Sequence, residues 1–136
     1  MLQFNKELHK DMPHFIIPGT LPSLNDFFAA NKRSPYVGAK MKRDYEMISC
    51  NAIRRGLKRF KTEKPIIIHY LVFEPTQKRD HDNVISGIMK CVQDALQKCN
   101  VIPNDGWKNV HNFTHDFFLD REKPRIEVYI EVLEDI

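Results

Sequence analysis

Residues 65–73 read Pro65-Ile66-Ile67-Ile68-His69-Tyr70-Leu71-Val72-Phe73, a run that is nearly all apolar and rich in β-branched side chains. A short run of this kind is typical of a strand that is buried on both faces. Glu74-Pro75 ends it, because proline has no amide to donate to a neighbouring strand. The sequence therefore predicts the central strand of a sheet here.

A helix and two more strands are predicted downstream. Between Val84 and Leu96, apolar residues recur at helical spacing, with Asp82 as the expected N-cap. Residues 109–120 and 125–133 read as strands joined by a polar turn. In the second of them, apolar and polar residues alternate, which predicts one solvent-facing side.

The first half of the chain is more polar. A short strand is predicted at Phe15-Ile16-Ile17, then a loop entering a turn over residues 21–28, and a basic segment over 31–36. Residues 40–60 carry a helical period. We expect one α/β (α+β) domain over residues 1–136, with a small mixed sheet packed against two main helices and residues 1–12 flexible.

Composition limits the class of protein. A chain of 136 residues, 42% of them hydrophobic, suits one globular domain. It contains no apolar run near the ~20 residues that cross a bilayer, and its polar, acidic start is unlike a signal peptide. Three cysteines without a C-x-x-C pair indicate free thiols in a reducing compartment, so we expect a cytoplasmic protein without a membrane partner.

Charge is unevenly distributed along the chain. Residues 40–64 hold nine Lys/Arg against three acids, whereas residues 116–136 hold seven acids against three bases. This segregation suggests one face that meets a polyanion, although a helix with a solvated basic face has the same pattern. The cations that we expect to follow a DNA backbone are Lys32, Arg33, Arg43, Arg54, Lys58 and Arg79.

Two carboxylates stand two residues apart at Asp80-His81-Asp82. On an extended backbone they would point to the same side. Mg²⁺ is commonly held by one or two carboxylates together with a substrate phosphate, and Lys90 on the following helix could stabilise charge on that phosphate. The alternative is that both aspartates only compete to cap the helix.

Four elements occur in an order that resembles the RusA-type Holliday junction resolvases (crossover junction endodeoxyribonucleases). They read Leu21-Pro22-Ser23-Leu24-Asn25, Lys78-Arg79-Asp80-His81-Asp82-Asn83, Asp94-Ala95-Leu96 and Asn100-Val101-Ile102-Pro103-Asn104-Asp105. The resemblance covers roughly residues 13–133. It implies a Mg²⁺-dependent endonuclease, with Mn²⁺ as a possible substitute and no small-molecule cofactor, that resolves four-way DNA junctions. It also implies that Asp80, Asp82 and Asp105 bind the metal and that Lys90 assists.

One length estimate bears on this site. A helix from Asp82 to Lys98 spans about 25 Å, whereas the return from Cys99 to Asp105 covers at most about 20 Å. We therefore expect a homodimer, in which Asp105 could meet the aspartate pair of the other subunit. Two other functions stay open, a non-catalytic module that binds branched DNA and a nuclease for other branched DNA. Trp107 could stack on an unpaired base, but burial is the expectation.

Overall fold

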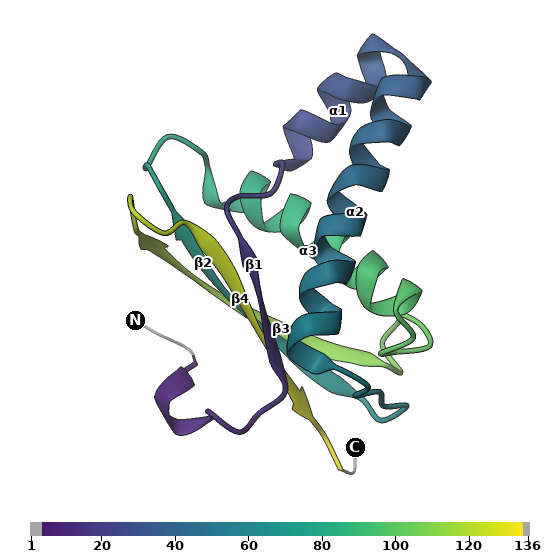
Figure 1. The fold of residues 1–136 in the computed structure, drawn as a ribbon, viewed down its shortest axis with the longest axis vertical. Helices are drawn as coiled ribbons and strands as arrows, with labels where there is room; N and C mark the ends of the chain where they lie inside the picture. The colour runs from purple at the N-terminus through teal and green to yellow at the C-terminus, as the bar shows by residue number, and fades with distance from the viewer. Residues whose placement is uncertain (1–3, 135–136) are drawn as a thin grey trace.

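Four strands of the described chain form one mixed sheet: β1 (His14–Pro18), β2 (Ile66–Glu74), β3 (Val110–Leu119) and β4 (Arg125–Val132). The structure is a computed structural model that describes residues 4–134 (Figure 1). The strand order is β1-β4-β2-β3, and β2 pairs in parallel with β3 and antiparallel with β4. These two neighbours, and the burial of most of its residues, confirm β2 as the predicted central strand.

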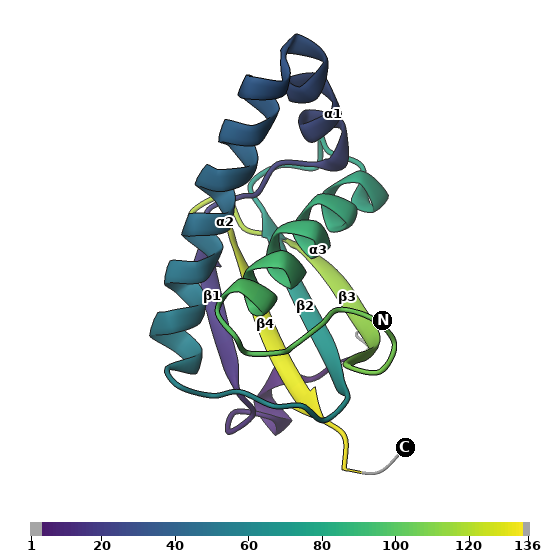
Figure 2. The ribbon, with the colours of Figure 1, turned by 90° about the vertical axis from the view of Figure 1, so that its right-hand side faces the viewer.

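Three α-helices within residues 4–134 complete a single α/β domain: α1 (Leu24–Arg33), α2 (Pro35–Leu57) and α3 (His81–Lys98). The two long helices, α2 and α3, correspond to the two main helices predicted from the sequence, and they cover one face of the sheet (Figure 2). Within the same residues, no helix combines the length and the apolar character that crossing a membrane requires.

Helix α1 replaces the loop that the sequence predicted over residues 21–28. Its start is fixed by a capping box, in which Ser23 Oγ accepts the Asp26 amide at 3.2 Å and the Asp26 carboxylate accepts the Ser23 amide at 2.9 Å. Ser34 then caps α2 by accepting the amide of Val37 at 3.0 Å. Helices α1 and α2 form a hairpin whose tip projects beyond the sheet (Figure 1).

The solvent-facing side predicted for β4 is covered along its middle. Glu127 and Tyr129 are only 4% and 7% exposed. The segment before β1 lies over them, and the buried Phe4 contacts Tyr129 with ring centroids 5.2 Å apart. Phe4 and Lys6 thus lie against the sheet, whereas residues 7–11 are exposed. The flexibility that we expected for residues 1–12 stays a prediction, and residues 1–3 lie outside the described residues.

Glu127 is held in this covered face by two cations. Its carboxylate lies 2.7 Å from Arg125 Nε and 3.0 Å from Lys6 Nζ. Burial by itself would raise the pKa of Glu127, but the hydrogen bonds from Arg125 and Lys6 outweigh burial and hold the pKa below its usual value. Burial and the nearby Glu127 charge raise the pKa of Tyr129 to about 12.

The cysteines are free thiols, as predicted. Cys50 and Cys91 are buried between α2 and α3, whereas Cys99 at the end of α3 is half-buried. Burial is the main cause that raises the pKa of Cys50 and of Cys91 to about 12. Neither buried thiol is therefore poised to act as a nucleophile.

Candidate functional site

The Asp80-His81-Asp82 motif lies at the N-terminus of α3, beyond the loop that follows β2. Asp80 is the N-cap residue, with φ −72° and ψ 137°, and its side chain makes no capping hydrogen bond. Asp82 is in the first turn, so the prediction that it caps the helix is wrong. Because the helix begins at His81, the two acids are also not the same-side pair of an extended strand that we expected.

The carboxylates of Asp80 and Asp82 are nevertheless open to solvent. Both residues are exposed, and neither side chain has a hydrogen-bond or ion-pair partner among residues 4–134. The partial positive charge at a helix N-terminus makes it favourable to place two negative charges there. Carboxylate oxygens of this kind can bind a divalent cation and leave positions for water and phosphate.

His81, between the two acids, lies flat against a ring of the sheet. Its imidazole stacks on Phe117 of β3 with ring centroids 3.9 Å apart and planes 4° from parallel. Beside it is a cavity of about 250 Å³, lined also by Phe118, Leu119 and the end of β2. The stack links the start of α3 to the end of β3, although nothing in the local sequence around His81 signals this contact.

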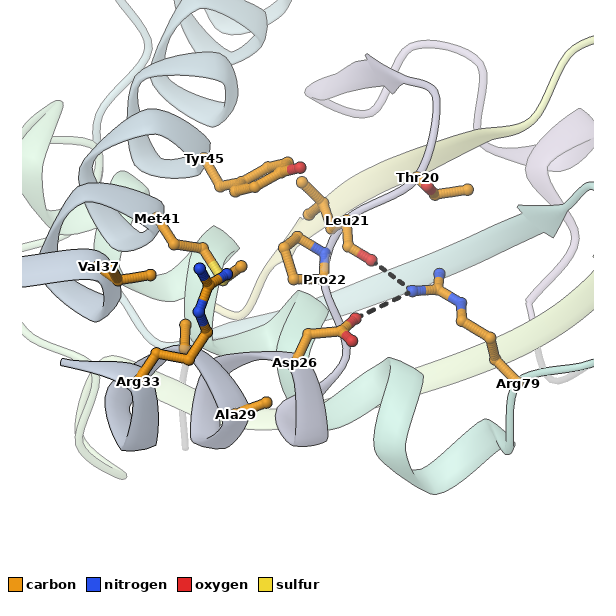
Figure 3. Close-up of a pocket in the computed structure, with 11 residues that line it drawn as sticks. Thr20, Leu21, Pro22, Asp26, Ala29, Arg33, Val37, Met41, Tyr45 and Arg79 are labelled. Carbon is orange, nitrogen blue, oxygen red and sulfur yellow. Dashed lines mark hydrogen bonds and ion pairs between the residues drawn. The ribbon is translucent and has the colours of Figure 1, made fainter.

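Arg79, predicted as a DNA contact, is bound inside the chain. Its guanidinium donates two hydrogen bonds to the Glu74 carboxylate, both at 2.9 Å, and one to the Leu21 carbonyl at 2.7 Å. It also lies 4.0 Å from the Asp26 carboxylate (Figure 3). Arg79 therefore ties the end of β2 to the loop before α1, beside a groove of about 430 Å³ whose other wall includes Arg33.

A close contact holds that same loop against α3. A Cβ placed on Gly87 would overlap the carbonyl oxygen of Pro22 and lie 2.9 Å from the carbonyl carbon of Ser23. Only a residue without a side chain allows this approach. The Pro22-Ser23 element is thus held one to two helical turns from Asp82, and two of the four motifs in the sequence lie side by side.

Asp105 is not brought to the aspartate pair within one chain. It lies in the loop between α3 and β3, which ends where the Asn109 carbonyl accepts the Ile66 amide at 2.9 Å, at the start of β2. The motif lies past the other end of β2, and the 18 residues of α3 span about 27 Å. Residues 4–134 contain no group of three His, Cys, Asp or Glu side chains arranged to hold a metal.

Lys90 lies on the exposed face of α3 that also carries Asp82. Eight residues separate them, which places Lys90 about 12 Å further along the helix axis. Between them, Ser86 Oγ donates to the Asp82 carbonyl at 2.7 Å. Asp94, about one helical turn beyond Lys90, has its carboxylate 4.0 Å from Lys42 Nζ of α2.

The remaining predicted DNA contacts are exposed and widely spread. None of the five forms an ion pair with another residue of the part that the structure describes, unlike Lys40 and Lys98, which pair with acids on α2. Two are at the tip of the α1–α2 hairpin and three along or just after α2: Lys32, Arg33, Arg43, Arg54 and Lys58.

The sequence matches no protein-family model and no curated protein. The resemblance to RusA-type resolvases therefore rests on the motifs in the sequence alone.

The sequence analysis missed two features that local sequence signals could have predicted. Ser23 followed by Asp26 is the spacing of a capping box and signals the start of α1. Trp107 was expected to be buried, but it is 93% exposed. It follows Asp105 by two residues in a polar turn, and such turns favour exposure.

Proposed function

We propose that this chain is a Mg²⁺-dependent, structure-selective DNA endonuclease, which resolves four-way junctions by paired nicks as RusA-type resolvases do. The observation that carries the proposal is the pair of unpartnered, solvent-facing carboxylates of Asp80 and Asp82 at the start of α3. Pro22 and Ser23, which belong to another of the four motifs of that resemblance, lie against the same helix at Gly87.

The donor set suits the ion. Mg²⁺ takes oxygen ligands and keeps several waters, and two carboxylates with one substrate phosphate fit that preference; Mn²⁺ accepts the same ligands. When bound, such an ion supplies an activated water and neutralises charge on the scissile phosphate. Asp80 and Asp82 would hold it, and Lys90 would attract a phosphate about 12 Å away along α3.

Asp105 completes this site only from a second copy of the chain. In one chain it lies at the far end of α3 from the other two acids. A two-fold homodimer would form two identical sites, and a four-way junction is itself two-fold symmetric. The exposed cations would then follow the DNA backbone, and affinity would fall steeply with salt, with a slope of about −0.9 per phosphate contact.

The test is cleavage of a synthetic four-way junction in Mg²⁺, in Mn²⁺ and in chelator. We expect paired nicks with either metal, and a loss of at least about 100-fold in rate for Asp82→Asn, since one of the carboxylate ligands is lost. The matched control is Asp94→Asn, on the same helix but facing Lys42, and it should retain activity.

The outcomes separate the three functions. Junction binding without cleavage by the wild type would favour a non-catalytic binding module. Faster cleavage of flaps than of junctions would favour a nuclease for other branched DNA. Equal cleavage rates for the wild type and Asp82→Asn would show that Asp82 is not a ligand of the metal.

A further inference from the structure

The groove of about 430 Å³ between the α1–α2 hairpin and the loop before α1 has an apolar floor. Leu21, Pro22 and Ala30 are buried beneath it, and the half-buried Val37 and Met41 of α2 form part of one wall. Pockets of this size that are mostly apolar and hold a few polar groups are typical of small-molecule sites. The groove therefore has the size and the lining of a binding site.

Charged side chains stand at the two ends of this groove. At one end, the Asp26 carboxylate lies 4.0 Å from Arg79, whose guanidinium is already bonded to Glu74 and Leu21 (Figure 3). At the other end, Arg33 is exposed and forms no ion pair with another residue of 4–134. The two ends are seven residues apart on α1, which is about 10 Å along the helix axis. A negatively charged group is thus favoured at the Arg33 end and disfavoured at the Asp26 end.

Two polar groups of the groove are free to bind a ligand. The half-buried Tyr45 has a hydroxyl without a hydrogen-bond partner among the described residues. Asp26 accepts the Ser23 amide at 2.9 Å through Oδ2, and this leaves its second oxygen unused. A carboxylate only accepts hydrogen bonds, whereas a tyrosine hydroxyl also donates. These groups suit a ligand edge that carries donors beside acceptors, as every nucleic-acid base does.

Contacts within its own walls hold the groove in shape. The Leu21 carbonyl accepts a hydrogen bond from Arg79 at 2.7 Å, and the capping box at Ser23 fixes the start of α1. A Cβ on Gly38 would overlap the side chain of Asn31, so α1 and α2 approach closely beside the groove. A site that is already ordered loses little conformational freedom when it binds.

We infer that this groove binds one unpaired nucleotide of a DNA strand, with its phosphate at Arg33 and its base between Tyr45 and Pro22. A nucleotide carries its negative charge at one end and a flat base with a hydrogen-bonding edge at the other, as the charges of the groove require. Arginine holds a phosphate through two parallel N–H groups. Contact between a base and an aromatic ring tolerates any base sequence. The inference rests on the proposed function in that the strand belongs to the branched substrate.

The groove adjoins the proposed metal site. Arg79 at one end of it directly precedes Asp80 in sequence, and Pro22 in its floor contacts α3 at Gly87. Both views of the ribbon place the start of α1 beside the start of α3 (Figures 1 and 2). Removing a base from a DNA stack costs least where the base is already unpaired. Binding in the groove therefore favours DNA with an unpaired base near the phosphate to be cut, which gives a physical basis for structure selectivity.

Binding in chelator, where no cleavage occurs, tests the inference. The probes are two fluorescently labelled duplexes of the same sequence, one fully paired and one with a single extra, unpaired nucleotide, compared by anisotropy. We expect the wild type to bind the second duplex about 30-fold more tightly, because one base–aromatic contact and one phosphate contact are added. Equal affinity for the two duplexes would overturn the inference.

Lys32 provides the matched control for Arg33. Both are exposed cations in the last turn of α1, but only Arg33 lines the groove. Arg33→Ala should reduce the preference for the unpaired nucleotide about tenfold, since a charge-assisted contact is lost. Lys32→Ala should weaken the binding of both duplexes alike and leave the preference unchanged. If the two variants changed the preference equally, the inference would be wrong.

Filling the groove tests the same site without a change of charge. Ala29 is exposed and lines the groove, so Ala29→Phe should fold normally, as circular dichroism would show, and should abolish the preference. Asn51→Phe adds the same ring at an exposed position of α2 outside the groove, and it should keep the preference. A folded Ala29→Phe variant that still prefers the unpaired nucleotide would contradict the assignment of the groove.

A free nucleotide is the other source of the same chemistry. Deoxyadenosine monophosphate should displace the duplex with the unpaired nucleotide only at millimolar concentration, because it lacks the neighbouring phosphates of a strand. Displacement at micromolar concentration, together with equal affinity for the two duplexes, would assign the groove to a free nucleotide and overturn its assignment to DNA.

The inference and the proposed function fail separately. If the preference depends on the groove as described but no branched DNA is cut with either metal, the inference stands and the nuclease proposal fails. If the wild type cuts four-way junctions but binds the two duplexes equally, the nuclease proposal stands and the inference fails.

Discussion

Replacing Arg79 by alanine should destabilise the fold rather than weaken the DNA binding that we propose. The side chain of Glu74 is only 11% exposed and that of Arg79 28%. Arg79→Ala removes three hydrogen bonds and leaves the Glu74 carboxylate without its cation. Breaking a buried pair costs about 3–5 kcal/mol. Arg79 is partly in water, so we expect about 3 kcal/mol, and a melting temperature lower by about 10 °C.

Urea unfolding followed by circular dichroism measures this loss. The control is Arg43→Ala, an exposed cation without an ion-pair partner among residues 4–134, which should change stability by less than about 0.5 kcal/mol. In the double variant Glu74→Gln/Arg79→Met, no charge is left unpaired, so much of the loss should be recovered. The reasoning is refuted if Arg79→Ala unfolds at the wild-type midpoint while its DNA affinity and salt slope both fall.

Two further substitutions and one labelling experiment have defined expected results. Gly87→Ala should lower the free energy of unfolding in urea by about 2 kcal/mol, because the added methyl group meets the Pro22 backbone and this cost outweighs the gain in helix propensity. A gain in stability would instead show that the loop with Pro22 moves freely. Glu127→Gln should be less stable than wild type at neutral pH, and the difference should shrink as pH falls below the usual glutamate pKa, because the lowered pKa of Glu127 makes its contribution disappear in acid. Iodoacetamide should label Cys50 and Cys91 only after unfolding, as mass spectrometry of the native and denatured protein would show, since burial raises both pKa values to about 12.

Local patterns were enough to locate most of the framework. The apolar run that became β2 and the helical period that became α3 each depend on residues near one another in sequence. Burial of both faces of a strand leaves a continuous apolar run, and burial of one face of a helix leaves a periodic pattern. The same holds for the Asp80 and Asp82 pair, whose position near the start of a helix is readable from the chain alone. The capping box of α1 was equally local, and it was missed because Pro22 and Ser23 were read only as a turn.

Only the tertiary structure shows which segment covers a face of the sheet and which charged side chains pair with each other. Glu127 looks like a solvent-facing residue of an alternating strand, and it is buried because Lys6 and Arg125 approach it. Arg79 looks like a free cation until Glu74 is found against it. Lys6 is 121 residues from Glu127, so no local pattern signals that pairing. Arg79 is only five residues from Glu74, but the loop between them must fold back before the two charges meet. The energy of a buried charge depends on the partner that it meets in the folded chain.

The position of Asp105 shows both contributions together. Sequence length alone predicted that a straight helix would carry the chain too far for an easy return to Asp80 and Asp82. The fold placed Asp105 and the aspartate pair at opposite ends of an open edge strand. A helix fixes distance through its rise per residue, so separation could be computed from sequence. Direction depends on how α3 packs on the sheet, and only the packed domain determines it.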